Sequence, residues 1–189
     1  MAGSHPLAGV EDFWQDVMDD MEATAEEYRD AGWDVLALHP GDVTALPTAS
    51  AQATPDRVGL DVLLPGDEFE ELEGLVAETD AEFDEYDAYR AETDDVVFLV
   101  VAMKSESAGA AVVFPLYYAV SEAAPMLKQV ARIGELRTYL RPLDDSSRVL
   151  FTQQEPSNLL PEEFTADADD GGESDADGGD GGTDDSGDA

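Results

Sequence analysis

The sequence predicts an α+β fold: a mainly antiparallel sheet of six or seven strands, centred on the hairpin 96–120, with three amphipathic helices mostly on one face. Two observations carry this prediction. The runs Val96–Met103 and Ala108–Val120 are apolar, of strand length and rich in Val, Phe and Tyr, and four polar residues separate them. Three other segments repeat apolar residues at the spacing of a helix.

The first half of the chain alternates helical and strand patterns. Val10, Phe13, Val17 and Met21 recur at helical spacing, and Gly32 suits the end of that helix. The strand over 57–64 alternates apolar and polar residues, whereas the segment 44–55 shows no period and is expected to be a long loop. The elements expected here are a helix over 9–30, strands over 33–38 and 57–64, a helix over 68–78 and a weak edge strand over 83–92.

The second half continues from the hairpin into a third helix. Ser121 is expected to cap a helix over 122–133, with Pro125 in its first turn, where a proline is tolerated. A last pair of strands follows, over 136–140 and 148–152. The segment 153–164 has only the pattern of a polar stretch that leads the chain out of the domain.

Composition divides the chain into three regions. Residues 1–8 are expected to be a flexible N-terminus, and 9–164 a single α+β domain. The remaining segment, 165–189, has ten acidic residues, seven glycines and no basic residue. It cannot bury enough apolar surface to offset its ordering entropy, so we expect a disordered acidic tail.

The charge balance is strongly acidic over the whole chain. There are 45 acidic residues against nine basic ones, a net charge of −36 at pH 7. Only Lys104 and Lys128 are lysines. This composition is typical of proteins from halophilic archaea, in which multimolar salt screens the repulsion and hydrated cations cover the surface. It argues against binding to nucleic acid, which needs a basic face.

Several classes of site and location are not expected. The chain has no cysteine, which excludes disulfides and thiolate metal sites. Its N-terminus lacks the pattern of a signal peptide, and no apolar run is long enough to cross a membrane. The sequence therefore predicts a cytoplasmic protein that binds neither a membrane nor a cofactor.

No motif points to a catalytic residue or to a metal site. The common nucleotide, hydrolase and zincin signatures are absent. His39 is the one histidine within 9–164 and ends a predicted strand close to Asp42. The two residues could form part of a pocket, but an ordinary loop histidine is the favoured interpretation, because a catalytic assignment needs geometry that spacing alone does not provide.

The segment 128–148 is the one net positive stretch of the chain. Arg137 and Arg141 are an even number of positions apart, so both point to one face of a regular strand. The arginines could bind an anion or an acidic partner. Alternatively, they neutralise the domain's own acids through intramolecular pairs. The five basic residues of this strip are Lys128, Arg132, Arg137, Arg141 and Arg148.

Four segments in order carry a resemblance to a known family. They are EEYRDAGWDVLALHPGDV, RVGLDVLLPGDEFEEL, YRAETDDVVFLVVAMKSES and AVVFPLYYAVSEA. With them, the stretch 13–151 resembles an uncharacterised family of small acidic cytoplasmic proteins of halophilic archaea. The resemblance implies a compact α+β domain in the cytoplasm and transfers no catalytic residue.

Two functional hypotheses follow. The first is a non-enzymatic interaction or regulatory domain that uses a sheet face or the 128–148 strip, with a protein partner or a second copy. The alternative is a small enzyme or a domain for anionic small ligands, using His39 and the arginines of 132–141. A third hypothesis, DNA mimicry, is weak because the acids are spread as halophilicity alone would place them.

Overall fold

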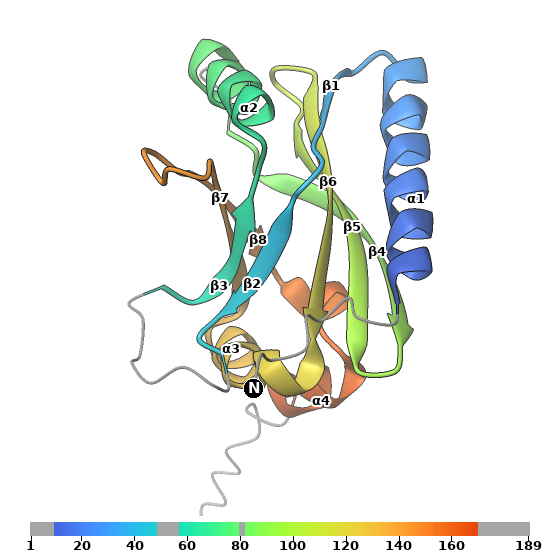
Figure 1. Cartoon of the computed structure of the whole chain (residues 1–189), viewed down its shortest axis with the longest axis vertical. Helices are drawn as coiled ribbons and strands as arrows, with labels where there is room; N and C mark the ends of the chain where they lie inside the picture. Colours follow the sequence, from blue (N-terminus) through green and yellow to red (C-terminus); the bar gives the residue numbers. More distant parts are fainter. Residues whose placement is uncertain (1–9, 49–56, 80–81, 170–189) are drawn as a thin grey trace, which may run out of the picture.

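In the computed structural model, residues 10–48, 57–79 and 82–169 are described. They form two four-stranded sheets that lie against each other, with helices at the outside and at both ends (Figure 1). Because apolar residues of the two sheets share one buried cluster, this part of the chain has a common core.

Sheet A contains the predicted hairpin. Its strand order is β1 (Asp34–Ala37), β6 (Ala110–Ala119), β5 (Val96–Ser105) and β4 (Glu85–Thr93). β5 and β6 pair antiparallel along their whole length and are buried on both sides, as their unbroken apolar runs predict. β4 lies at an edge, as its mixture of aromatic and charged residues indicates.

Pro115 lies inside β6, although a proline in a central strand removes a ladder hydrogen bond. The carbonyl of Val113 faces β1, since it accepts a hydrogen bond from the amide of Leu38 at 2.9 Å. Pro115, two positions further, faces the same side, but β1 has already ended at Ala37. The missing N–H therefore costs no pairing with β5.

Sheet B is formed by strands from distant parts of the chain. Its order is β2 (Asp42–Leu46), β3 (Gly59–Leu63), β7 (Glu135–Arg141) and β8 (Val149–Gln154). β3 and β7 are parallel, and the two outer pairs are antiparallel. Side chains along β8 alternate between buried and exposed, so one face of the sheet meets the core and the other faces outward.

The prediction of one mainly antiparallel sheet is therefore wrong. The described residues form two mixed sheets, each with one parallel pair, and four α-helices where three were expected. The second sheet covers the inner side of the hairpin. A strand such as β5, which is apolar on both faces, needs cover on both sides, and sheet B and α1 (Glu11–Asp30) provide it.

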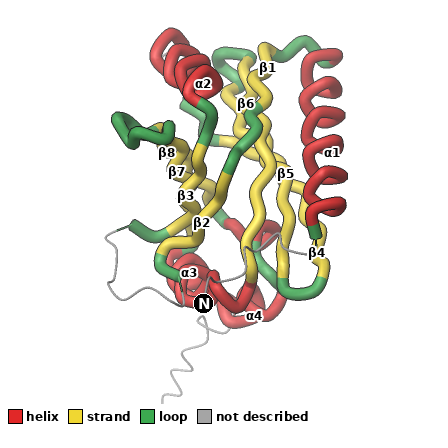
Figure 2. The backbone as a smooth tube through the Cα atoms, in the orientation of Figure 1, coloured by secondary structure: helices red, strands yellow, loops and turns green. Residues whose placement is uncertain are grey.

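The helices lie around this sandwich. α1 packs on the outer face of sheet A, where Trp14 meets Tyr117 and Phe13 meets Phe98, each at 5.0 Å between ring centroids. Figure 2 shows the other helices at the two ends, in red. They are α2 (Gly66–Thr79) at one end, and α3 (Val120–Ile133) and α4 (Glu162–Asp169) at the other.

Three local predictions need correction. Residues 42–46 form β2, so part of the expected loop 44–55 is a strand, and residues 49–56 lie outside the described residues. Ser121 does not cap α3, because the helix begins at Val120 and Ser121 donates to Asp95 instead. Pro125 is accordingly the sixth residue of the helix and lies beyond its first turn.

The segment 153–164 is more structured than a polar exit. It continues β8 and then forms a 3-10 helix, η1 (Pro156–Leu159), and the start of α4. Leu159 and Leu160 are buried, and the Tyr118 hydroxyl donates to the carbonyl of Leu159 at 2.7 Å. The helix α4 runs to Asp169, and the rest of the predicted tail lies outside the described residues.

Aromatic and polar contacts join the two sheets. Phe114 of β6 stacks on Phe151 of β8 with 6.1 Å between ring centroids. The buried Gln153 amide donates to the sulfur of Met103 at 3.2 Å and accepts from the hydroxyl of Thr138 at 3.2 Å. These contacts satisfy the polar groups that the strand β8 brings into the core.

Candidate functional site

The outward side of sheet B gathers arginines in an otherwise acidic molecule. Asp61, Tyr139 and Leu150 are aligned across β3, β7 and β8. Side chains two positions before or after each of these residues in its strand point to the same side of the sheet. No helix of the described ranges lies over this side in Figure 1. We call it the arginine face, and it consists of Arg57, Asp61, Arg137, Tyr139, Arg141 and Leu150.

Most charges on the arginine face are in ion pairs. The Nε of Arg141 contacts Asp61 at 2.9 Å, and Nη2 of Arg137 contacts Glu135 at 2.5 Å. Hydrogen bonding to Glu135 raises the pKa of Arg137 above its ordinary value. Even so, the side chain of Arg137 is 47% exposed, so its guanidinium can reach a second acceptor.

Arg57 is held differently. Its guanidinium lies over the ring of Tyr139, 5.7 Å from the centroid, which is a cation–π arrangement. Its Nη1 is buried and has no hydrogen-bond partner within the described residues. A buried donor without an acceptor costs free energy, so this group favours any acceptor that arrives at the face.

Gly59 allows β3 to approach β7 beneath these side chains. A Cβ at this position would lie 2.0 Å from the carbonyl oxygen of Arg137, and the backbone φ is +147°. Only glycine avoids both the clash and the strained conformation. The close approach brings Arg57 and Asp61 beside the arginines of β7.

The predicted basic strip does not form one surface. β7 is regular, so Arg137 and Arg141 share a face as expected, but Lys128 and Arg132 are exposed on α3. Arg148 pairs with Asp145 at 2.5 Å in the turn before β8. Three of the five strip residues thus make intramolecular ion pairs. Such pairs are what we expect if the strip neutralises the domain's own acids.

His39 and Asp42 have different partners. The ring of His39 contacts Glu68 through Nδ1 at 2.6 Å and Glu22 through Nε2 at 2.5 Å. Partial burial lowers the pKa of His39, but the hydrogen bonds to Glu22 and Glu68 outweigh it, and the net shift is upward. Asp42 instead accepts from the Tyr117 hydroxyl at 3.1 Å. The cluster around His39 joins β1, α1 and α2, which is a structural role.

Two features are not found among the described residues. They contain no group of three or more His, Cys, Asp or Glu side chains that could hold a metal ion. Among the helices of the same residues, none has the length and apolar character needed to span a membrane.

Sequence reasoning missed four members of the arginine face, namely Arg57, Asp61, Tyr139 and Leu150. Arg57 and Asp61 lie on the polar side of an alternating strand, which does predict that they point outward. The pattern does not reveal that this strand lies beside β7. Tyr139 was overlooked because a tyrosine in a short strand is usually part of a core.

The fold and the site define a two-sheet α+β domain in which one sheet face combines arginines with the half-exposed Leu150 and the buried Tyr139. The chain belongs to a family of unknown function, DUF7529, whose model matches residues 4–161. The predicted likeness to an uncharacterised family is confirmed at this level. No curated protein and no solved structure matches the chain significantly.

Proposed function

We propose that the protein is a non-enzymatic interaction domain that binds another protein through the arginine face. The observation that carries the proposal is that no helix of the described residues lies over this face, on which Arg137 and Leu150 are each about half exposed. A flat sheet face without a covering helix is a surface that a partner can bury.

The composition of the face supports the proposal. Arginine is among the residues enriched in protein interfaces, and the half-exposed Leu150 adds apolar area beside Arg137. The exposed guanidinium of Arg137 offers donors to carboxylates or main-chain carbonyls. The partner that fits is therefore a protein surface with acceptor groups around an apolar centre.

The test compares two leucine-to-glutamate variants of the full chain. Leu150→Glu places a negative charge in the arginine face, and Leu143→Glu places the same charge at an exposed position in the turn between β7 and β8. The tagged proteins are recovered from the producing cells after crosslinking, and bound proteins are quantified by mass spectrometry. Circular dichroism checks that both variants fold, and light scattering gives the mass of each complex.

We expect wild type and Leu143→Glu to retain one stoichiometric partner and Leu150→Glu to lose it. If the partner is a second copy, light scattering should give twice the mass of one chain for wild type and the mass of a single chain for Leu150→Glu. A partner that stays bound to Leu150→Glu contradicts the role of the arginine face. A monomer without partners in all three proteins contradicts the interaction function itself.

We also propose that this interaction takes place in the cytoplasm of a halophilic archaeon. Support comes from the net charge of −36 and from the presence of only two lysines in the chain. In multimolar salt, long-range charge contributes little to binding, so the apolar contacts of the half-exposed Leu150 would matter more than the charges.

A second candidate, the binding of a small anion, rests on Arg57 alone. Its buried Nη1 has no acceptor among the described residues, and an anion would supply one. His39 is not part of this candidate, because both of its ring nitrogens contact carboxylates. Inorganic phosphate and citrate should then raise the melting temperature of wild type but not of Arg57→Gln; equal shifts contradict this candidate.

A further inference from the structure

β4 is a long edge strand of sheet A whose outer edge is unpaired. It has nine residues and pairs with β5 at every position, without a bulge or a proline. The other edge strands, β1, β2 and β8, have four, five and six residues. Among the described residues, no backbone hydrogen bond joins β4 to a segment other than β5, and no residue of β4 is buried. A long, regular and open edge is suited to pairing with a further strand.

The pairing of sheet A shows which backbone groups of β4 are free. Pro115 of β6 faces β1, so its partner Val100 of β5 directs its N–H and C=O toward β4, where it is aligned with Tyr89. Tyr89 and every second residue on either side of it therefore bond to β5. The backbone groups of the alternate residues point to the open edge, and these residues are Tyr86, Ala88, Arg90 and Glu92.

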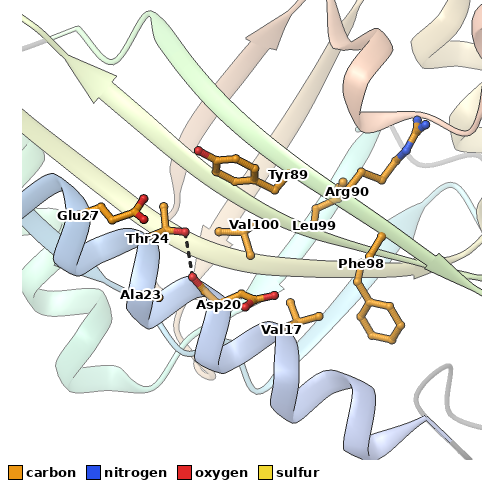
Figure 3. A pocket seen from close by; sticks show the side chains of 11 residues that line it. Val17, Asp20, Ala23, Thr24, Glu27, Tyr89, Arg90, Phe98, Leu99 and Val100 are labelled. Carbon is orange, nitrogen blue, oxygen red and sulfur yellow. Dashed lines mark hydrogen bonds between the residues drawn. The ribbon is translucent and has the colours of Figure 1, made fainter.

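The charged side chains near the centre of β4 are already paired within the chain. Asp87 contacts Nζ of Lys104 at 3.0 Å and accepts a hydrogen bond from the hydroxyl of Tyr28. Arg90 points away from α1 in Figure 3 and donates to the carbonyl of Leu160. These charges therefore do not keep another strand away from the edge. The other charged residues lie toward the two ends of the strand, at Glu85 and Glu92.

Tyr89 is the middle residue of β4 and is 56% exposed. It lies on the outer side of sheet A, where Figure 3 shows it close to Val100 of β5. Ala91, two positions further on the same side, is exposed as well. An aromatic side chain at the centre of an open edge gains contact area when an added strand places another aromatic residue opposite it.

We propose that β4 pairs antiparallel with β4 of a second copy of the chain, so that sheet A continues across a two-fold axis beside Tyr89. In this register Tyr89 lies opposite its own counterpart, in a pair of the closer kind with about 4.5 Å between the Cα atoms. Ala88 is aligned with Arg90, and Tyr86 with Glu92. Each of these residues exchanges two backbone hydrogen bonds with its partner, using the groups that point to the open edge.

The side chains of β4 are compatible with themselves in this register. On the outer side Asp87 meets Ala91, and Glu85 meets Thr93, so no charged residue lies directly opposite a charge of the same sign. The net charge of −36 opposes the association of two copies in dilute buffer. Multimolar salt screens this repulsion and leaves neutral backbone hydrogen bonds in place.

The neighbouring registers fit less well. Those that preserve the backbone hydrogen bonds move the axis to Ala88 or to Arg90, and each pairs fewer residues of the strand. The first places Tyr89 opposite Asp87. The second places two arginines directly opposite each other, which is destabilising. The axis beside Tyr89 is therefore the register that the strand favours.

A direct test of the register uses the absence of cysteine from the chain. Tyr89→Cys places two thiols at the axis, where a Cα separation of about 4.5 Å lies within the span of a disulfide. Ala91→Cys is the control on the same side of the same strand. Its two thiols would be four positions apart along the strands, about 14 Å, which a disulfide does not span. Both full-length variants are mildly oxidised in multimolar KCl, and the covalent dimer is quantified on a denaturing gel.

Three further variants test the contact without a crosslink. Tyr89→Glu places two carboxylates directly opposite each other at the axis. Leu143→Glu adds the same charge at a residue that is 80% exposed in the turn between β7 and β8. Ala88→Pro removes an N–H that points to the open edge and leaves the pairing with β5 intact. Light scattering in multimolar KCl gives the mass of each protein, and circular dichroism checks that it folds.

We expect wild type and Leu143→Glu to have twice the mass of one chain, and Tyr89→Glu and Ala88→Pro to fold and have the mass of one chain. Tyr89→Cys should crosslink at least about tenfold faster than Ala91→Cys, because only its thiols are within reach. A wild-type monomer, a dimer that persists in Tyr89→Glu, or equal crosslinking of the two cysteine variants would overturn the proposal.

Leu150→Glu separates this proposal from the one for the arginine face. It lies on sheet B, so it should keep the β4 dimer while it loses a partner bound at the arginine face. A Leu150→Glu protein with the mass of one chain would place the second copy at the arginine face and would also overturn the β4 pairing.

Discussion

His39 shows how one residue can join three elements. It lies after β1 and contacts Glu22 of α1 and Glu68 of α2, and its backbone N–H also donates to Glu68 at 2.7 Å. The two carboxylates favour the charged form of the ring, and this is why its pKa is raised despite partial burial.

The pKa of His39 leads to a prediction about pH. A histidine whose pKa is raised on folding stabilises the protein fully below its unfolded value of about 6.5 and loses that contribution as pH rises through the raised pKa. We expect His39→Gln to cost about 0.2–1 kcal/mol at pH 6, because the ring is 38% exposed and partly screened. The cost should shrink as pH rises above neutrality.

Urea unfolding of wild type and His39→Gln between about pH 6 and pH 9 measures this difference. His5→Gln, which removes the other histidine of the chain, is the matched control. A difference between wild type and His39→Gln that grows with pH would contradict the proposed charged cluster.

Gly59 carries a steric prediction. Gly59→Ala would place a Cβ 2.0 Å from the Arg137 carbonyl oxygen in a conformation that alanine rarely adopts. We expect this overpacking to lower the free energy of unfolding by about 1–3 kcal/mol or more.

Gly74→Ala is the control. Gly74 lies in α2 with no atom within 4 Å of the added methyl, so this variant should be more stable than wild type by about 0.5–1 kcal/mol. Chemical denaturation measures both values, and a Gly59→Ala variant as stable as wild type would show that β3 and β7 are not in this close contact.

At the scale of elements, the C-terminal part of the domain makes a testable contribution to the core. Leu159 of η1 is fully buried, and its carbonyl accepts from Tyr118 of sheet A. Leu159→Ala should therefore destabilise the protein by about 2–5 kcal/mol. Leu143→Ala, at a leucine that is 80% exposed, should change stability by less than about 0.5 kcal/mol. Similar thermal unfolding of the two variants would mean that η1 is not part of the core.

The elements that the sequence predicts well are those with a long local period. The runs of β5 and β6, the apolar stripe of α1 and the left-handed Gly32 after that helix are each visible within one window of the chain. β2 has only Val43 and Ala45 as buried positions, and η1 has few residues. Segments of that length are too short to show a period.

The division into two sheets could not be predicted in the same way. A strand's period of two residues indicates which side chains share a face, but it does not identify the neighbouring strand. The pairing of β3 with β7 places Asp61 beside Tyr139, although the two residues are far apart in the sequence. The same limit applies to the arginine face: the shared face of Arg137 and Arg141 follows from spacing, whereas the addition of Arg57 depends on that distant pairing.

At the scale of the whole molecule, the two outer sides of the sandwich differ in their cover. α1 packs on the outside of sheet A, whereas no helix of the described residues lies over the arginine face on the outside of sheet B. The core between the sheets separates the two sides, so a partner at the arginine face does not contact α1.

Net charge gives the last prediction. Because the chain has a net charge of −36, repulsion between its acidic residues opposes the compact state in dilute buffer. Raising KCl from about 0.1 M to about 1 M shortens the Debye length from about 10 Å to about 3 Å and screens this repulsion. We expect the melting temperature to rise by roughly 10 °C, which corresponds to a few kcal/mol for a chain of this size. A domain of similar size and near-zero net charge, measured in parallel, reports the general effect of KCl on apolar burial. If both proteins shift equally, the acidic surface is not an adaptation to salt, because screening acts only where there is repulsion to remove.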